Sequence, residues 1–309
     1  MKIAIIGAGR NRNGIGQYIG KYLQKNGANV VSVLGTNEES VQKASSNLTH
    51  YGINATNYID FHSMVKRERP DAIVIASPAL THYEYLMKCV DGGVHVFCEK
   101  PFFWQQKEDI DIQTLLENIF EKAASKDLKI AMNSQWPFSL PHYEELCGSI
   151  NIRQVDTFFI SMSPMVSGKE MIVESVPHAL SILHSVFGDG QINNLNIEAH
   201  EDKIMLKFHY ISTVRNCEVL IDLARKMLQP RSFSYGFNNK IIHRKIDLDR
   251  YDISFYYSNR NLKINDPLES SVQDFISAIK DKREPLIGKT HIMNNMKLLN
   301  KIYHCCELL

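Results

Sequence analysis

The first residues with clear chemical potential are the glycines of a short loop, GAGRNRNGIG, which follows the apolar run Lys2–Ile6. A glycine-rich turn between a strand and a helix leaves backbone N–H groups free to face a phosphate, and the start of the helix adds positive potential. The usual fingerprint, Gly-x-Gly-x-x-Gly, requires glycine where this chain has Arg12, and the third glycine comes at Gly14. An ordinary glycine turn with solvated arginines is the other interpretation. We predict a phosphate-binding turn made by Gly7, Gly9, Arg10, Arg12, Gly14 and Ile15.

A second set of binding residues is expected after the next apolar run, where Leu34 is followed by Gly35, Thr36 and Asn37. In dinucleotide-binding folds, an acidic residue about 20 residues after the glycines binds the ribose hydroxyls of NAD. This chain has no carboxylate there before Glu38. A carboxylate would repel a 2′-phosphate, whereas a glycine and a hydroxyl leave room for one and nearby arginines supply counter-charge. We therefore favour NADP(H) over NAD(H) as the cofactor.

The elements that position these residues follow from the hydrophobic pattern of the first 133 residues or so. Short apolar runs predict strands at Lys2–Ile6, Val30–Leu34, Ala72–Ala76, Val94–Phe97 and Lys129–Met132. Longer amphipathic runs between them predict helices at Ile15–Lys25, Glu38–Leu48, His82–Val90 and Ile110–Ala124. Near-continuous apolar strands separated by helices indicate a parallel sheet covered on both faces. The pattern is that of a doubly wound α/β domain.

The pattern changes after about residue 134. Strands are predicted at Val155–Met162, Ile204–Ile211, Glu218–Leu223, Lys240–Ile246 and Asp252–Tyr257, and helices at Glu174–Phe187, Leu268–Ile279 and Thr290–Tyr303. The first of these helices is expected to begin near Pro177, because proline is favoured at the start of a helix. We therefore predict two domains, a doubly wound domain at 1–134 and an α+β domain with a large, mostly antiparallel sheet at 135–309.

Composition narrows the function classes. The chain has 309 residues, with 44% hydrophobic and 22% charged residues, which excludes a disordered or fibrous protein. The net charge is only +1, which argues against a nucleic-acid binder. The six cysteines contain no Cys-x-x-Cys pair, so we expect reduced thiols in a cytoplasmic protein and no metal site. No apolar run approaches the roughly 20 residues that span a bilayer, so no membrane partner is expected.

The most specific string is ASPALTHYEYLMKCVDGGVHVFCEKPF, from Ala76 to Phe102. It resembles the glucose–fructose oxidoreductase / inositol dehydrogenase family (Gfo/Idh/MocA), whose pattern is Pro-x-x-x-His, Gly-x-His-Val and Glu-Lys-Pro. The later string VQDFISAIKDKREPLIG, Val272–Gly288, resembles the family's C-terminal helix and the turn after it. The resemblance implies an N-terminal Rossmann domain and a C-terminal α/β domain. It also implies a homodimer or homotetramer formed through the open face of the second sheet; a solvated sheet face is the other interpretation.

The lysine of Glu-Lys-Pro is the family's signature active-site residue, so the resemblance makes Lys100 the first catalytic candidate. It comes at the carboxyl end of a strand expected to be parallel, where doubly wound sheets place ligands. A cation there can hydrogen-bond the substrate oxygen, and Lys100 can also position the cofactor. The resemblance further implies cofactor contacts from Ser77, Pro78, His82 and Glu99.

The family's second motif is an acidic residue followed four residues later by histidine. Glu174 and His178 match it, with glutamate in place of the usual aspartate. Residues four apart share a helix face, and histidine titrates near neutral pH, so His178 is a candidate acid/base; a buried structural histidine is the alternative. Glu174 would orient His178, bind substrate hydroxyls or cap the helix. Gln135 and Trp136 are candidate substrate contacts, although Trp136 also suits packing, and 133–143 lacks the family's common arginine.

These residues together predict an NAD(P)-dependent oxidoreductase. Hydride would pass between the nicotinamide and a hydroxyl or carbonyl carbon of a sugar, a nucleotide-linked sugar or a cyclitol, a small polar substrate. Lys100 would polarise the reacting oxygen and His178 would exchange the proton. Two alternatives keep the fold: a reductase of an imine or another biosynthetic intermediate, and a non-catalytic NAD(P)-sensing regulator. The presence of both Lys100 and His178 disfavours the regulator.

Overall fold

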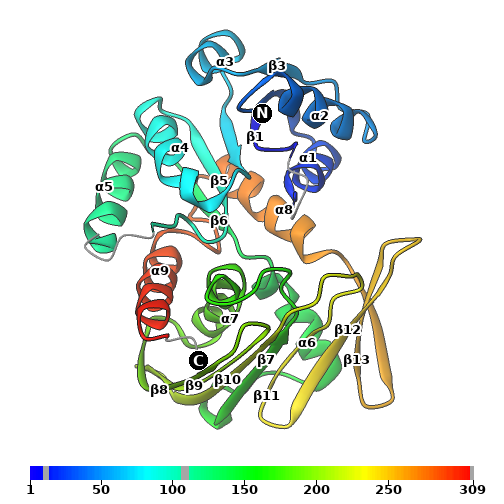
Figure 1. Ribbon diagram of the computed structural model, residues 1–309, viewed down its shortest axis with the longest axis vertical. Helices are drawn as coiled ribbons and strands as arrows, with labels where there is room; N and C mark the ends of the chain where they lie inside the picture. Colours follow the sequence, from blue (N-terminus) through cyan, green and yellow to red (C-terminus); the bar gives the residue numbers. More distant parts are fainter. Residues whose placement is uncertain (10–13, 106–110, 307–309) are drawn as a thin grey trace. The chain divides into compact units, whose positions relative to one another are not determined.

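A computed structural model of the chain describes residues 1–9, 14–105 and 111–306 (Figure 1). The chain divides into two compact units. The first contains Met1–Asn133 and Leu268–Ile292, and the second contains Ser134–Pro267 and Met293–Leu309. The division differs from the expected one because residues 268–292 belong to the first unit rather than to the second.

The first unit is built on a six-stranded sheet in the order β3-β2-β1-β4-β5-β6, with every neighbouring pair parallel. Its strands are β1 (Lys2–Ile6), β2 (Asn29–Leu34), β3 (Thr56–Tyr58), β4 (Ala72–Ile75), β5 (His95–Glu99) and β6 (Ile130–Asn133). The helices between them are α1 (Gly16–Lys25), α2 (Glu38–Thr49), α3 (Phe61–Glu68), α4 (Ala79–Asp91) and α5 (Ile112–Ser125). The strand order reverses between β1 and β4, which is the point where such sheets bind ligands.

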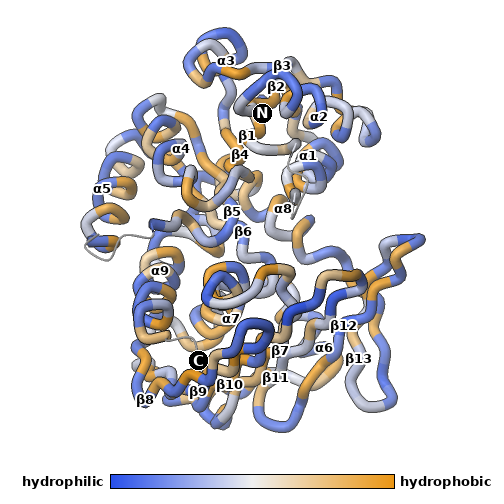
Figure 2. The backbone as a smooth tube through the Cα atoms, viewed as in Figure 1, coloured by the Kyte–Doolittle hydropathy of each residue, from blue (hydrophilic) through white to orange (hydrophobic). Residues whose placement is uncertain are grey.

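The core of the first unit explains why residues 268–292 return to it. Helix α8 (Pro267–Lys280) carries Val272 and Phe275, both fully buried. The Phe275 ring lies 5.2 Å from the ring of Phe97 on β5, and both belong to the hydrophobic cluster of β1, β2 and β4. Figure 2 shows that β1 and β4 are largely apolar, as expected for strands buried on both faces. Helix α8 therefore covers apolar surface that α1–α5 leave open.

The second unit is built on an eight-stranded sheet in the order β14-β13-β12-β11-β7-β10-β9-β8. Its strands are β7 (Thr157–Met162), β8 (Gly190–Ala199), β9 (Lys203–Ser212), β10 (Asn216–Ala224), β11 (Phe233–Phe237), β12 (Lys240–Asp247), β13 (Asp252–Tyr257) and β14 (Arg260–Ile264). Only β7 and β10 pair in parallel. The helical segments are η1 (Trp136–Ser139), α6 (Leu140–Cys147), η2 (Ile152–Gln154), α7 (Glu170–Phe187) and the part of α9 (Lys289–His304) that follows Ile292. The predicted fold class, a doubly wound parallel sheet and a mostly antiparallel one, is confirmed.

Helix α7 begins earlier than the sequence suggested. It starts at Glu170 and contains Pro177 in its interior, so the prediction of a start near Pro177 is wrong. Proline removes one helical hydrogen bond, but the turns before it carry Met171 and Ile172, both fully buried. Burial of these side chains stabilises the turns that proline alone would disfavour. The Pro177 carbonyl accepts a hydrogen bond from Nδ2 of Asn295 at 2.9 Å.

Candidate functional site

The glycine turn follows β1 and is closely packed against the end of β4. Gly7 has φ +84°, and a Cβ there would lie 2.6 Å from the backbone nitrogen of Ser77. A Cβ on Gly9 would lie 2.3 Å from the Ser40 carbonyl oxygen in α2. Only glycine fits these two positions without moving backbone. Arg10 and Arg12 lie outside the described residues.

The turn leads into α1 through Gly14 and Ile15, which are both half-buried. Ile15 is the N-cap residue, and its side chain makes no capping hydrogen bond to the helix. The first turn of α1 contains no acidic residue. Since the first N–H groups of a helix have no partners within the helix, this end suits an anion.

The end of β2 is packed against the start of α2. A Cβ on Gly35 would lie 2.3 Å from Oγ of Ser40, so a longer side chain does not fit there without movement. Thr36 and Asn37 are exposed. Oδ1 of Asn37 accepts a hydrogen bond from the Ser40 backbone at 2.9 Å and caps α2. Asn37 therefore has a structural role in the first unit, and its predicted cofactor contact stays a prediction.

The Glu-Lys-Pro segment forms a turn at the carboxyl end of β5. Glu99 is 8% exposed and pairs in register with Asn133 on β6, whose side-chain amide donates to Oε1 of Glu99. Lys100 follows and is half-buried, and the Lys100–Pro101 peptide is cis. Oδ1 of Asn133 is buried without a hydrogen-bond partner among the described residues. A buried acceptor of this kind can take a hydrogen bond from a bound group.

The Ser77-Pro78 turn lies between β4 and α4. Pro78 is exposed, whereas Ser77 is 6% exposed and accepts a 2.7 Å hydrogen bond from Oγ1 of Thr81. His82 is 1% exposed, and its two ring nitrogens lie 2.8 Å from the Ser77 carbonyl oxygen and 3.0 Å from that of Pro101. The buried ring bonds to backbone on both sides, and its predicted cofactor contact stays a prediction.

These features of the first unit fit a dinucleotide. The glycine turn and the uncapped start of α1 suit a pyrophosphate. A long side chain at Gly35 would require movement of Ser40, and the Asn133 oxygen, which has no partner among the described residues, offers an acceptor beside Glu99. The residues that would hold the cofactor therefore gather at the carboxyl edge of one parallel sheet.

In the second unit, His178 and Glu174 lie one turn apart on α7. Nδ1 of His178 is 3.2 Å from the Ser134 hydroxyl. Oε1 of Glu174 is 3.7 Å from Nη1 of Arg231, and these two side chains are 19% and 26% exposed. Burial raises the pKa of the Glu170 carboxyl, and the nearby Glu174 charge adds to the effect. The helix thus presents an imidazole and a carboxylate beside an arginine.

Trp136 is packed rather than exposed, with 5% of its surface accessible. Its ring stacks on Phe233 with centroids 3.6 Å apart, and its edge faces His178 at 6.4 Å. The Arg244 guanidinium lies over both stacked rings, 5.2 Å from Trp136 and 5.4 Å from Phe233. Burial lowers the pKa of Arg244 to about 10. These contacts favour packing for Trp136, whereas the neighbouring Gln135 is half-buried at the start of η1.

Sequence reasoning missed Arg231 and Arg244. Segment 133–143, where an arginine was expected, contains none, and arginines from later segments were not considered as site residues. Arg231 lies just before β11 and Arg244 on β12, and Nη2 of Arg244 donates to the Arg231 carbonyl oxygen at 2.7 Å. The second sheet brings Arg244 to Trp136 and Arg231 to Glu174, and no local pattern in the sequence marks either arginine.

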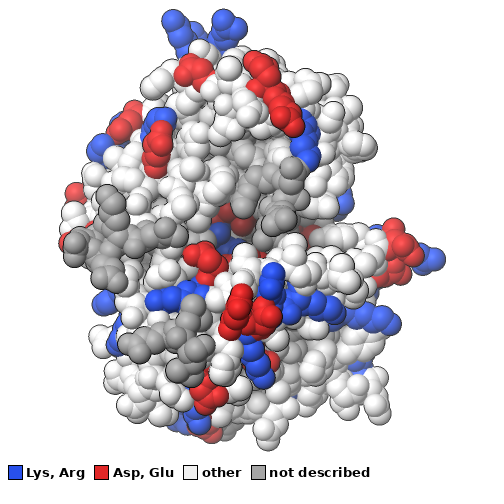
Figure 3. Space-filling view, in the orientation of Figure 1, with Lys and Arg blue, Asp and Glu red and all other residues white. Residues whose placement is uncertain are grey.

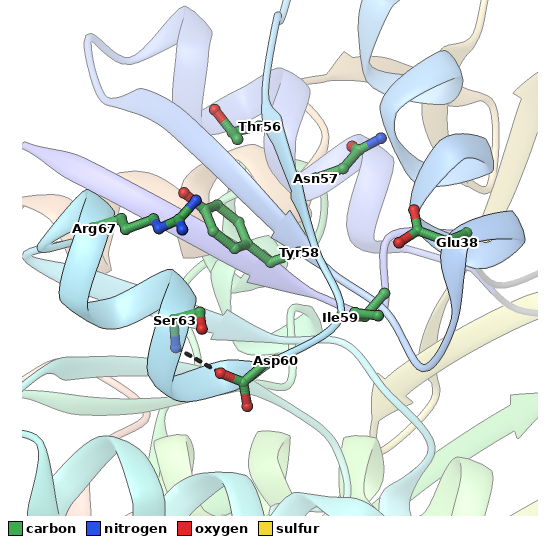
Figure 4. Close-up of a pocket in the computed structure, with 8 residues that line it drawn as sticks. All are labelled: Glu38, Thr56, Asn57, Tyr58, Ile59, Asp60, Ser63 and Arg67. Atoms are coloured by element: carbon green, nitrogen blue, oxygen red, sulfur yellow. Dashed lines mark hydrogen bonds between the residues drawn. The ribbon is translucent and has the colours of Figure 1, made fainter.

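A separate polar pocket of about 250 Å³ lies at the edge of the first unit's sheet (Figure 4). It is lined by Glu38, Thr56, Asn57, Tyr58, Ile59, Asp60, Ser63 and Arg67. None of them is among the predicted site residues. Asp60 caps α3 by accepting from the Ser63 backbone at 2.8 Å, and Tyr58 donates to Glu68 at 2.6 Å. Asp60 and Tyr58 therefore serve the local fold.

Four further features of the described residues are their charge distribution, metal-ligand groups, helix character and cysteines. Basic and acidic side chains are interspersed on the face shown in Figure 3. Across residues 1–9, 14–105 and 111–306, no group of three or more His, Cys, Asp or Glu side chains is arranged to hold a metal ion. Within the same ranges, none of the helices combines the length and apolar character needed to cross a membrane. The six cysteines are free, and Cys305 is the exposed one.

Comparison with known proteins gives matches in sequence and in fold. Residues 1–119 match the model of an oxidoreductase family with an NAD-binding Rossmann fold, Gfo/Idh/MocA. The chain is 31% identical over 101 residues to D-glucoside 3-dehydrogenase of Escherichia coli, covering 33% of this chain and 27% of that protein. It is 37% identical over 75 residues to inositol 2-dehydrogenase of Azotobacter vinelandii, covering 24% and 21%. The matched segments thus span about a quarter of these relatives.

The fold likeness extends over the whole chain. UDP-N-acetylglucosamine 3-dehydrogenase from Acidithiobacillus ferrooxidans superposes with a TM-score of 0.73 at 14% identity, covering 99% of this chain and 98% of that one. At this identity the likeness concerns the fold alone. The sequence match lies within the first unit, and the family resemblance of the Glu-Lys-Pro segment is confirmed with it. Over residues 1–119, the chain is thus similar to the Gfo/Idh/MocA oxidoreductase family, whose model describes an NAD-binding Rossmann fold.

Proposed function

We propose that the protein is an NAD(P)-dependent dehydrogenase that moves hydride between a nicotinamide and a hydroxyl-bearing carbon of a sugar, a nucleotide-linked sugar or a cyclitol. Lys100 polarises the reacting oxygen, His178 exchanges the hydroxyl proton, and Glu174 supports His178. The nicotinamide supplies the hydride chemistry when bound. The names of the relatives describe the activity of those proteins, and we propose an activity of the same kind for this whole chain.

One observation carries most of this proposal. The Glu99–Lys100 turn ends β5 beside Asn133 of β6, at the carboxyl edge where parallel sheets bind ligands. The same edge holds the glycine turn after β1. A lysine there is placed to act on a group bound beside the cofactor.

The direct test is a titration followed by a turnover screen. NADPH or NADH binding is followed by the fluorescence of the reduced nicotinamide, and sugars, nucleotide-linked sugars and cyclitols are then offered with either cofactor. Micromolar binding and cofactor turnover with one of these classes support the proposal. Absence of binding below millimolar concentration contradicts it, and tight binding without turnover favours a regulator.

We propose further that NADP(H) is preferred. The contact between Gly35 and Ser40 disfavours the carboxylate that NAD-specific proteins carry at the end of β2. Thr36 is exposed beside it and offers a hydroxyl to a 2′-phosphate. The exposed Glu38 and Glu39 in the first turn of α2 oppose this preference, so the ratio of the two affinities is the quantity to measure.

Thr36→Asp is expected to weaken NADPH binding about tenfold and to leave NADH binding within about threefold. Two like charges about 4 Å apart repel by about 1 kcal/mol in bulk water and by about 4 kcal/mol near a protein surface. A difference of about 1.4 kcal/mol changes a dissociation constant tenfold. The measurement is the dissociation constant of each cofactor. Ser46→Asp, at an exposed position of the following helix α2, is the matched control. Equal losses for NADPH and NADH would contradict the assigned preference.

Arg231→Met is expected to raise the KM for the polar substrate about tenfold while lowering kcat much less. The change keeps the apolar stem and removes the charge beside Glu174, and a hydrogen bond to a charged group contributes about 1.5–3 kcal/mol. Arg225→Met is the matched control, because Arg225 lies in the same connection and pairs with Asp202. If both variants have the parent KM, Arg231 does not contact the substrate.

We also propose self-association through the open face of the second sheet. On β9 and β10, buried residues alternate with residues that remain partly exposed. A face of this mixed character suits a partner chain. Sedimentation that gives a dimer or tetramer supports this, and a monomer at micromolar concentration contradicts it.

A further inference from the structure

Two arginines of the second unit lie close together beside the residues proposed for proton exchange. Nη2 of Arg244 donates to the Arg231 carbonyl oxygen at 2.7 Å. Nη1 of Arg231 lies 3.7 Å from Oε1 of Glu174. The Arg244 guanidinium lies over the ring of Trp136, and the ring of His178 is 6.4 Å from the same indole. Like charges repel, so two guanidinium groups in one place need anionic groups nearby to offset the repulsion.

Arg244 is a charged residue on the buried face of the sheet. It lies on β12 opposite the fully buried Phe255 of β13, and it shares a sheet face with the fully buried Ile242. Within the part of the chain that the structure describes, its guanidinium donates only to the Arg231 carbonyl and forms no ion pair. Its Nε is buried without a hydrogen-bond partner among the same residues. The protein therefore satisfies few of the donors of this side chain.

The surroundings of Arg244 disfavour its positive charge. Burial lowers the pKa of Arg244 to about 10, and Arg231 adds to the effect, whereas Tyr251 and Asp266 oppose it. This pKa is still well above neutral pH, so the guanidinium keeps its charge. A bound anion would supply both the opposite charge and the acceptors that such a group needs.

Arg231 is held in place by its backbone, and its side chain keeps its capacity for hydrogen bonds. Its N–H donates to Oε1 of Gln229 at 3.0 Å, and its carbonyl accepts from Arg244. The partly exposed guanidinium is paired with Glu174 at a distance too long for a hydrogen bond. No hydrogen bond joins this guanidinium to another of the described residues. A guanidinium has five N–H donors in a fixed plane, so Arg231 can bind an oxygen-rich group without first breaking a bond.

We propose that Arg231 and Arg244 form an anion-binding subsite, and that the substrate carries a negatively charged oxygen group, a phosphate or a carboxylate, which both guanidinium groups bind. Arginine binds such groups through charge-assisted hydrogen bonds in a defined geometry. The subsite favours acidic sugars, sugar phosphates and nucleotide-linked sugars over neutral cyclitols. This choice of substrate class rests on the proposed function, whereas the binding of an anion does not.

The alternative role of the two arginines is to hold Glu174, which supports His178. The two roles differ in the quantity that a substitution changes. Loss of an arginine that only positions Glu174 lowers kcat for charged and neutral substrates alike. Loss of an anion-binding arginine weakens the binding of charged ligands and leaves that of neutral ligands unchanged.

The first experiment measures anion binding without turnover. The chain has two tryptophans, so protein labelled with ¹⁵N-tryptophan gives two indole N–H signals, and Trp104→Phe identifies the signal of Trp136. UDP is compared with uridine, and glucuronate with glucose, at constant ionic strength because salt screens charges. We expect UDP or glucuronate to shift the Trp136 signal at millimolar concentration or below, and the neutral compound of that pair to bind at least about tenfold more weakly.

Each outcome of this titration decides a point. The anion that binds more tightly identifies the charged group as a phosphate or a carboxylate. No shift with either anion, or equal affinity for the neutral compounds, would overturn the subsite. This measurement uses the parent protein, so it stands even if a substituted protein fails to fold.

Arg244→Met and Arg231→Met each remove one charge and keep an apolar side chain. Each is expected to raise the dissociation constant of the anion about tenfold or more, as for the loss of a hydrogen bond between charged groups. Lys245→Met is the matched control, because Lys245 is the next residue on β12 and is exposed on the opposite face of the sheet. An equal loss in Lys245→Met would show a general attraction of anions and would overturn the subsite.

Anion binding and turnover can fail independently of each other. If the protein oxidises a neutral sugar with NADP⁺ or NAD⁺ and no anion shifts the Trp136 signal, the proposed function stands and the subsite is refuted. If an anion binds at Arg231 and Arg244 but no cofactor binds, the subsite stands and the proposed function fails.

Discussion

Replacing Lys100 by alanine is expected to lower kcat about 10²–10³-fold while leaving the NADPH dissociation constant within about fivefold. The ammonium group is assigned to the reacting oxygen, and removing one donor of this kind typically costs about 10²–10³-fold. The loss should appear in kcat rather than in KM, because the charge that it stabilises develops as hydride moves. Steady-state kinetics and a fluorescence titration of the cofactor measure the two quantities.

The control for this variant is Lys122→Ala on α5. Lys122 forms a surface pair with Asp91 at 2.8 Å, and such pairs contribute about 0–1 kcal/mol, so both turnover and binding should remain at the parent level. Lys100→Arg keeps a charge but changes its shape, and it should recover only part of the activity. Full activity in Lys100→Ala would contradict the proposed catalytic role of Lys100.

His178→Asn is expected to lower kcat by about 10²–10⁴-fold, the usual contribution of a positioned acid/base. In the direction of alcohol oxidation the neutral imidazole accepts the proton, so the parent rate should fall as the pH drops and the ring becomes protonated. That acid limb should be absent in the variant, because asparagine does not titrate. A pH profile of kcat between about pH 5 and 9 spans the range in which histidine changes charge.

His184→Gln provides the matched control on the same helix. His184 is bonded to Asp189 at 3.0 Å and lies beyond the residues assigned to chemistry, so its replacement should keep both rate and acid limb. If His178→Asn lowers kcat but kcat still falls at low pH, a different group is responsible for the pH dependence. Ser134, whose hydroxyl lies 3.2 Å from Nδ1 of His178, would then be the first neighbour to replace.

Much of the first unit was predictable because its strands are buried on both faces. Runs such as Lys2–Ile6 are continuous in apolar character, and the structure places β1 at those same residues. The strand β3 was missed because Thr56–Tyr58 has three residues and no apolar run. In the second unit β8, β11 and β14 were missed. Of these, β8 and β14 consist largely of polar, partly exposed residues, as sheet edges often do.

The site residues that the sequence predicts are those marked by their neighbours in sequence, and the residues that it misses depend on contacts between distant segments. Lys100 and His178 are marked by neighbouring residues, Glu99 and Pro101 in one case and Glu174 in the other. Arg231 and Arg244 carry no such mark, because only the pairing of β7, β11 and β12 brings Arg244 to Trp136 and Arg231 to Glu174. The burial of His82 likewise depends on where the turn after β5 folds, which the pattern Pro-x-x-x-His does not state.

The return of residues 268–292 to the first unit has a consequence for synthesis of the chain. When residues 1–133 have emerged from the ribosome, the six strands are present, but the surface around Phe97 still lacks Val272 and Phe275. The backbone N–H of Met132 also lacks its hydrogen-bond acceptor at that stage, because in the complete fold it donates to the Ile287 carbonyl oxygen at 3.0 Å. The cofactor-binding half of the chain is thus translated first and completed late, and the whole second sheet is made while that half still exposes apolar surface.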